Sequence, residues 1–215
     1  MKTKSVKSLL TVALVATMVV GSAFSVFAKT TTTTGDGGAG EVISATEAEV
    51  REATVNAGAV VVVGGRTVHN TVQSVILTKA AQGVYVSTPL ADVKAALGLK
   101  LGQNPKLLVY DLDAKKSTAA MTSINAAVEA LQGEFITAFD IDLSAVENDK
   151  KVTLTDGTVA MTMGLPKGVD TTKTYVMVCV QPGGETTVLE DQDTNPATIT
   201  FAVQAGLGAY ALVAK

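Results

Sequence analysis

Two stretches of the C-terminal half decide the fold: Val159–Leu165, which reads VAMTMGL, and Ile199–Val203, which reads ITFAV. Both place a large apolar residue at every second position, as a β-strand with one buried face requires. Further strand-sized runs are Lys151–Leu154, Tyr175–Val180, Thr186–Leu189 and Ala209–Val213, with turn sequences such as Asp156-Gly157 and Pro182-Gly183-Gly184 between them. Short strands at this spacing predict an antiparallel β-sandwich over residues 139–215.

Several motifs of this half carry a family resemblance. They are Phe139–Leu143 (FDIDL), Val159–Asp170 with its Leu-Pro-Lys-Gly turn, Tyr175–Val178, Gly183-Gly184, Ile199–Phe201 and Gly208–Leu212 (GAYAL). Together they resemble the small immunoglobulin-like (Ig-like) β-sandwich modules of secreted and surface proteins from Gram-positive bacteria. The sequence departs at Gly206-Leu207-Gly208, where related modules often have a Ser or aromatic cluster. The resemblance implies an Ig-like sandwich that acts as a spacer or adhesive unit.

Residues 44–138 mix helix and strand signals and predict an α/β domain, which makes the whole chain α+β. Ser44–Glu47 has the spacing of a capping box and predicts a helix running toward Val55. The β-branched run Ala57–Val63, followed by Gly64-Gly65 and Arg66–Val68, predicts a β-hairpin. A phosphate-binding loop at the two glycines is the alternative, but no lysine or helix follows them. Strands are predicted at Val75–Leu77 and Val84–Val86, separated by a turn at Gly83.

Two helices are predicted in the second part of this region. The first has Pro89 at its first position, Leu90, Val93 and Leu97 on one face, and Gly98 as its stop. The second carries Met121, Ile124, Val128 and Leu131 on one face and ends at Gly133. A buried strand at Leu107–Tyr110, after an Asn104-Pro105 turn, precedes it, and a strand at Phe135–Leu143 follows. This order predicts a parallel strand-helix-strand crossover.

The N-terminal 28 residues have the features of a secretory signal peptide. Lys2, Lys4 and Lys7 precede an apolar run, and small residues lead up to Ala28. An uncleaved membrane anchor over residues 9–28 is the alternative, because the run is about long enough to span a bilayer. Cleavage would remove three lysines and no acid and take the formal charge from −3 to −6, which disfavours a nucleic-acid partner. Residues 29–43, rich in Thr and Gly, predict a flexible linker.

The core is expected to be aliphatic and free of disulfides. The chain has no Trp, and its one cysteine, Cys179, lies in the apolar run Val176–Val180. A cysteine in such a run is usually a buried core residue. The alternative is a catalytic thiol, for which His69 is the only imidazole partner that the chain offers.

Asp111 and Asp113 form the one pattern with catalytic potential. They follow the apolar strand Leu107–Tyr110, and a strand with Asp-x-Asp after it resembles the nucleophile loop of haloacid-dehalogenase-type phosphatases. That resemblance implies one carboxylate attacking phosphorus, the other acting as acid or base, and Mg²⁺ between them. Lys115 stands where that family usually has Thr or Val, and no downstream acidic pair stands out as the one that would hold the metal.

Three other roles remain open for the residues of this loop. Asp113 or Ser117 could cap the following helix, and Asp111 with Asp113 could hold a divalent cation. Lys115, Lys116 and Ser117 could bind an anion at the N-terminus of the helix. The candidate binding residues are therefore Asp111, Asp113, Lys115, Lys116 and Ser117, with no catalytic residue, metal ligand or cofactor assigned.

The sequence favours a secreted bacterial protein without enzymatic activity. We expect it to have a structural, adhesive or binding role outside the cell or loosely held at the cell wall. Its expected partner is an envelope or extracellular molecule or a second copy of the chain, with no transmembrane segment left after signal removal. A small secreted metal-dependent hydrolase of phosphatase type, centred on Asp111 and Asp113, is the alternative function.

Overall fold

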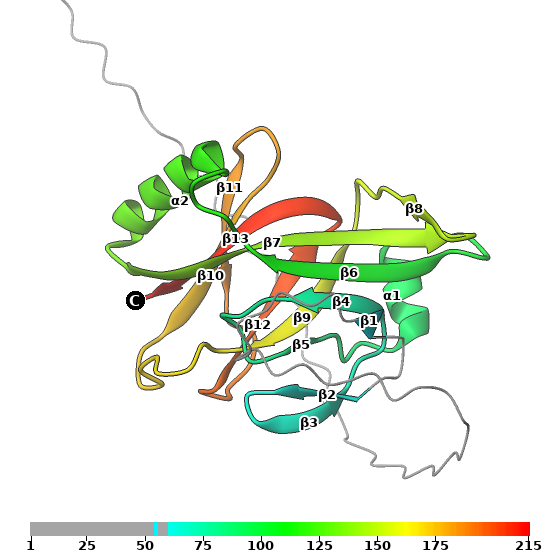
Figure 1. Ribbon diagram of the computed structural model, residues 1–215, viewed down its shortest axis with the longest axis horizontal. Coiled ribbons are helices and arrows are strands. Elements are labelled where there is room, and N and C mark those ends of the chain that lie inside the picture. Colours follow the sequence, from blue (N-terminus) through cyan, green and yellow to red (C-terminus); the bar gives the residue numbers. More distant parts are fainter. Residues whose placement is uncertain (1–53, 56–59) are drawn as a thin grey trace, which may run out of the picture. The chain divides into compact units, whose positions relative to one another are not determined.

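The computed structural model describes residues 54–55 and 60–215, which are mostly β-structure (Figure 1). The elements are β1 (Thr54–Val55), β2 (Val60–Val63), β3 (Arg66–His69), β4 (Gln73–Leu77), β5 (Val84–Tyr85), α1 (Leu90–Ala96), β6 (Asn104–Asp111), α2 (Thr118–Leu131), β7 (Glu134–Glu147), β8 (Lys150–Val152), β9 (Thr158–Gly164), β10 (Tyr175–Val180), β11 (Thr186–Glu190), β12 (Thr198–Gln204) and β13 (Gly206–Ala214). The expected signal peptide, the linker and the capping box at Ser44–Glu47 lie outside the described residues.

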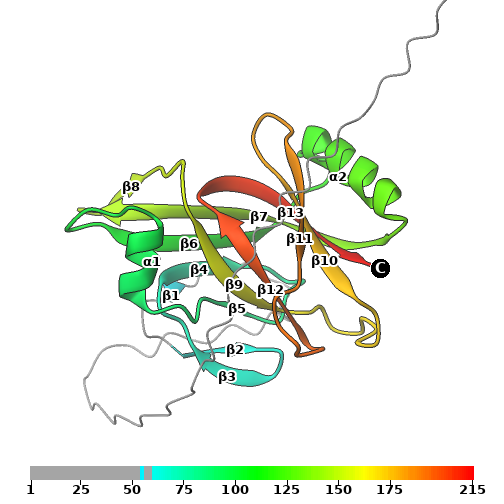
Figure 2. The same ribbon diagram turned by 180° about the vertical axis from the view of Figure 1, so that it is seen from behind.

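The strands form two facing sheets and a separate hairpin. The large sheet has the order β1-β4-β6-β7-β13-β10-β11, with β8 added beside β7. The small sheet has the order β12-β9-β5, and Figure 2 shows it in front of the large sheet. β2 and β3 form the hairpin. All pairings among the described strands are antiparallel except that of β4 with β6, which is parallel.

The main core lies between the two sheets. From the large sheet it takes alternate residues such as Phe139 and Ile141, and from the small sheet Met161, Met163 and Phe201, all 0–1% exposed. Because successive strand residues point to opposite faces, the alternation in the sequence is what assigns these side chains to the interior. Two facing sheets around a mostly aliphatic core are compatible with the predicted β-sandwich, although strands before residue 139 also belong to both sheets and Phe139, Phe201 and Tyr210 are among the largest buried side chains.

A second core lies on the other face of the large sheet, under α2. Val176 and Val178 of β10, with Ala211 of β13, pack there against Ile124, which is fully buried. β10 is thus buried on both faces, which explains why its sequence is continuously apolar instead of alternating. The small alanines of β13 leave room for α2 to lie close to the sheet.

Most of the local predictions are confirmed. The hairpin turns at Gly64 and Gly65, whose φ values of 55° and 78° suit a two-residue hairpin turn. α1 ends before Gly98, which has φ 59°, although Pro89 is the cap residue and not the first helical residue. α2 has its C-cap at Gln132 in the left-handed conformation, one residue before the expected stop.

The predicted parallel crossover from β6 to β7 is wrong, because these strands pair antiparallel. α2 packs mainly on β10 and does not run back along β6, so the chain re-enters the sheet at the end where it left. The parallel pair is β4 and β6, and α1 lies in the connection between them.

Three smaller expectations also differ from the structure. Thr54 and Val55 form a strand with β4, where the end of a helix was expected. Asn104 and Pro105, expected in a turn, belong to β6 and pair with β7. Pro105 precedes Lys106, the first residue of β6 that pairs with β4, so its missing N–H costs no bond to β4. The expected domain boundary between residues 138 and 139 falls inside β7, and strands from both sides of it share the large sheet.

Candidate functional site

Asp111 lies at the end of β6, where the parallel pairing brings it beside Thr78. The register pairs Leu77 with Tyr110, so the next residues of the two strands are neighbours at the same edge of the sheet. The Thr78 hydroxyl donates to Asp111 Oδ1 at 2.5 Å, and the Lys79 amide donates to Oδ2 at 2.7 Å. The Ala80 amide also reaches Oδ1, at 3.4 Å. Both carboxylate oxygens therefore accept hydrogen bonds from the loop after β4.

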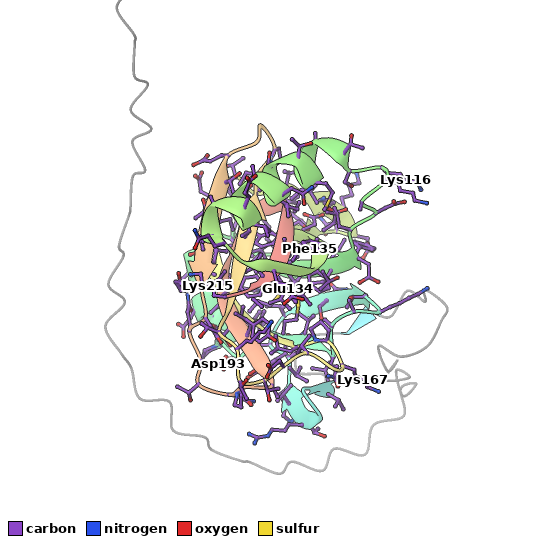
Figure 3. All side chains as sticks on the ribbon, turned by 90° about the vertical axis from the view of Figure 1, so that its left-hand side faces the viewer. Lys116, Glu134, Phe135, Lys167, Asp193 and Lys215 are labelled. Carbon is purple, nitrogen blue, oxygen red and sulfur yellow. The ribbon has the colours of Figure 1, made fainter. Side chains whose placement is uncertain are left out.

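Asp113 is exposed and bonds within its own loop. Its Oδ1 accepts hydrogen bonds from the Lys115 amide at 3.0 Å and the Lys116 amide at 3.4 Å, and the Lys116 ammonium lies 3.6 Å from Oδ2. These local bonds form an Asx-type turn that leads into α2. Figure 3 shows Lys116 at the margin of the molecule, pointing into solvent.

The expected side-chain cap of α2 is absent. Ser117 is the N-cap residue, but its hydroxyl makes no capping hydrogen bond. The backbone carbonyl of Asp113 accepts from the amides of Lys116 and Ser117, so a main-chain turn closes the approach to the helix. Ser117 is therefore the N-cap residue, as one of the two alternatives predicted, but it caps α2 without a side-chain hydrogen bond.

All five predicted binding residues belong to the segment from the end of β6 to the start of α2, but the two carboxylates serve different loops. Asp111 joins this segment to the loop after β4, and Asp113 shapes its own turn. Among residues 54–55 and 60–215, no three His, Cys, Asp or Glu side chains are grouped as a metal site would need. Cation or anion binding by this loop stays a prediction.

Cys179 lies in the core between the sheets, beside Tyr210. The two residues are cross-strand neighbours on β10 and β13, and each is at most 1% exposed. Burial raises the pKa of the Cys179 thiol and that of the Tyr210 hydroxyl. His69 belongs to β3, in the separate hairpin. A buried thiol with a raised pKa suits a core residue better than a nucleophile.

The Tyr210 hydroxyl has a specific bonding role. It accepts a hydrogen bond from the backbone amide of Gln204 at 3.2 Å, six residues earlier in the chain, across the change from β12 to β13. Its ring lies 5.8 Å from that of Phe201, and Gln181 Nε2 donates to Cys179 Sγ at 3.3 Å. Tyr210 therefore ties the connection between the two sheets to the core.

Sequence reasoning missed a polar network between β11 and β12. Asp191 Oδ1 accepts from the Thr200 amide at 2.9 Å, and Asp193 Oδ2 accepts from the Thr200 hydroxyl at 2.6 Å. Asn195 Oδ1 in turn accepts from the Ala197 amide. The signal in the sequence was the repeated Asx residue at positions 191, 193 and 195, a spacing that favours successive Asx turns. These side chains close part of the outer edge of β12.

A second polar group missed by the sequence lies on the outer face of β7. Asp140, Asp142 and Ser144 alternate there, and Lys151 of β8 forms an ion pair with Asp142. Burial raises the pKa of Asp140. Ser144 Oγ is buried with no hydrogen-bond partner among the described residues.

Comparison with known proteins adds no relative: the chain matches no protein-family model, no curated protein and no solved structure. Within the part of the chain that the structure describes, neither helix is long and apolar enough to cross a bilayer.

Proposed function

We propose that this chain is an exported bacterial protein without enzymatic activity, with a structural, adhesive or binding role at the cell envelope or outside the cell. The observation that carries this proposal is the hydrogen bonding of Asp111, the strongest catalytic candidate of the sequence. Its two carboxylate oxygens accept hydrogen bonds from the loop after β4, which favours a role in holding that loop. The signal-like residues 1–28 support export.

We further propose that the sandwich is Ig-like. In that architecture strand B pairs with E in one sheet, while C pairs with F in the other and C′ lies beside C. The pairs β9·β12, β10·β13 and β10·β11 correspond to these three. β5, beside β9, takes the place of strand A. β7, beside β13, takes the place of strand G, although β7 precedes β13 in the chain whereas strand G follows strand F.

The position of Tyr210 supports the same assignment. Many Ig-like domains have a tyrosine on strand F whose hydroxyl bonds to the backbone a few residues upstream, at the corner between E and F. Tyr210 lies on β13, the counterpart of F, and its hydroxyl accepts from the Gln204 amide at the end of β12, the counterpart of E. Architecture of this kind suits a module that displays a surface.

The test is to locate the protein and its mature N-terminus in cells of the producing bacterium. We expect mass spectrometry to find a chain beginning near residue 29 in the medium or in the envelope fraction, and an affinity pull-down with residues 29–215 to recover an envelope or extracellular partner or the chain itself. Unprocessed protein in the cytoplasmic fraction would contradict export. Phosphatase turnover by the purified chain would contradict the non-enzymatic role.

A further inference from the structure

The outer edge of β11 is open among the residues that the structure describes. β11 ends the large sheet and pairs there only with β10. The Gln181 amide donates to the Glu185 carbonyl, which makes these two residues a hydrogen-bonded pair. From there along β10 and β11, hydrogen-bonded pairs alternate with pairs that make no hydrogen bond to each other. Thr187 and Leu189 therefore point their backbone groups at β10, whereas Thr186, Val188 and Glu190 point theirs outward.

The outer edge of β12 is treated differently. Thr200 turns its backbone groups outward there, and its amide is bound by the Asp191 carboxylate while its carbonyl accepts from the Gln192 amide. The Thr198 amide donates to the Asn195 carbonyl, and the Gln204 amide to Tyr210. The chain thus covers most of this edge with its own groups. Within residues 54–55 and 60–215, nothing covers the outer edge of β11 in this way, and the strand contains no Pro or Lys, the residues that commonly block an exposed edge.

We propose that a second copy of this chain pairs with β11 through its own β11, in antiparallel orientation about a two-fold axis at Val188. This inference deepens the proposed structural role and rests on it, because it names the partner as the chain itself. Val188 would face the Val188 of the second copy, and Thr186 would face Glu190. Each of the three outward residues would then both donate and accept one main-chain hydrogen bond across the axis.

The side chains of β11 are compatible with this register. Val188, 37% exposed, would form a β-branched pair with its own copy, a favourable cross-strand contact. Glu190 would face Thr186 and not a second carboxylate, and it already has a charge partner in Lys215, whose ammonium lies 3.1 Å away. Asp191, the next residue, directs its carboxylate toward β12 and away from the new ladder.

The helices also leave room for the second copy. α2 lies mainly over β10, one strand in from the edge. With strands about 4.8 Å apart, α2 would lie about 7 Å from the axis, and the two copies of α2 would be about 14 Å apart. A helix with its side chains is about 10–12 Å across, so the two helices would not overlap.

Analytical ultracentrifugation of residues 29–215, together with variants at position 188, tests this pairing. We expect the native chain to dimerise, and the Val188→Lys and Val188→Glu variants each to raise the dimer Kd about tenfold or more, because like charges would meet on the axis. An equimolar mixture of the two variants should restore a dimer, since opposite charges then face each other. Val188→Thr, which keeps the β-branch and the amide, is the matched control and should dimerise like the native chain.

Hydrogen exchange provides a measurement that needs no variant. The amides of Thr186, Val188 and Glu190 should become protected as protein concentration rises, while those of Thr187 and Leu189 are protected at every concentration. A native chain that stays monomeric, or a dimer that neither charged variant weakens, would overturn the proposal. So would a dimer that both variants weaken and their mixture does not restore, since another segment would then occupy the edge. None of these results depends on where the protein is located in the cell.

Discussion

Replacing Asp111 by Asn separates the structural role of this residue from a catalytic one. In the native structure, Oδ1 accepts from the Thr78 hydroxyl and Oδ2 from the Lys79 amide. Asn keeps one oxygen but carries no charge and places an NH₂ group where the second oxygen was, so both bonds lose their charge assistance and one donor loses its acceptor. A bond of this kind contributes about 1.5–3 kcal/mol, and because the Lys79 amide is near solvent we expect a loss of about 2 kcal/mol.

For a chain of this length, that loss corresponds to a fall in Tm of about 4–8 °C. Urea unfolding followed by far-UV circular dichroism measures it directly. Asp113→Asn is the matched control, because Asn can form the same Asx turn and the side chain is exposed; it should change stability by less than about 0.5 kcal/mol. Equal stability of the native chain and Asp111→Asn, combined with a metal-dependent phosphatase activity that only the native chain shows, would refute the structural assignment.

Three further predictions test the core and its polar groups. Tyr210→Phe should lower the free energy of unfolding by about 1–2 kcal/mol, because the Gln204 amide loses its acceptor; an unchanged urea midpoint would contradict this. Gly133→Ala should lower the free energy of unfolding by about 1–3 kcal/mol, because a Cβ there would lie 2.5 Å from Val213 Cγ1. Gly168→Ala adds its carbon where no atom lies within 4 Å, so it measures the backbone cost of a positive φ alone. Burial raises the pKa of Asp191 above 3.8, so the contribution of this residue to stability is largest below pH 3.8 and is lost as pH rises through the raised pKa. Asp191→Asn should lack this loss. Parallel profiles of unfolding free energy against pH for the two proteins would contradict the assignment.

Most strands and turns could be predicted from the sequence, because the alternation of a strand and the position of a turn depend on neighbouring residues alone. Apolar alternation in β9 and β12 reports which face of each strand is buried, and glycines with positive φ report where the chain must turn. The pairing of β6 with β7 depends on where α2 packs, and that is decided by β10 and β13, more than forty residues later in the chain. No spacing within the strand-helix-strand segment contains that information.

In the candidate site, too, the residues could be predicted from the sequence but their tertiary contacts could not. The sequence identified Asp111 by its place after an apolar strand, but its partner Thr78 is 33 residues earlier and becomes a neighbour only through the parallel pairing of β4 and β6. The Asp191 and Asp193 network is likewise defined by contacts with Thr200 on the next strand. A side chain's chemistry can be read from the sequence, but what occupies its hydrogen-bonding groups depends on tertiary structure.

The place of β13 in the large sheet has a consequence for biogenesis. β13 follows all the other described strands in the chain, yet it lies between β7 and β10 and supplies residues to both hydrophobic cores. Neither core can close before β13 is available, so a nascent chain that ends before Gly206 lacks the interactions that would lock it into a compact form. Because this central strand comes after the other described strands, the segment before it can stay unfolded while it is being made, a property that suits passage through a narrow translocation channel before folding on the far side.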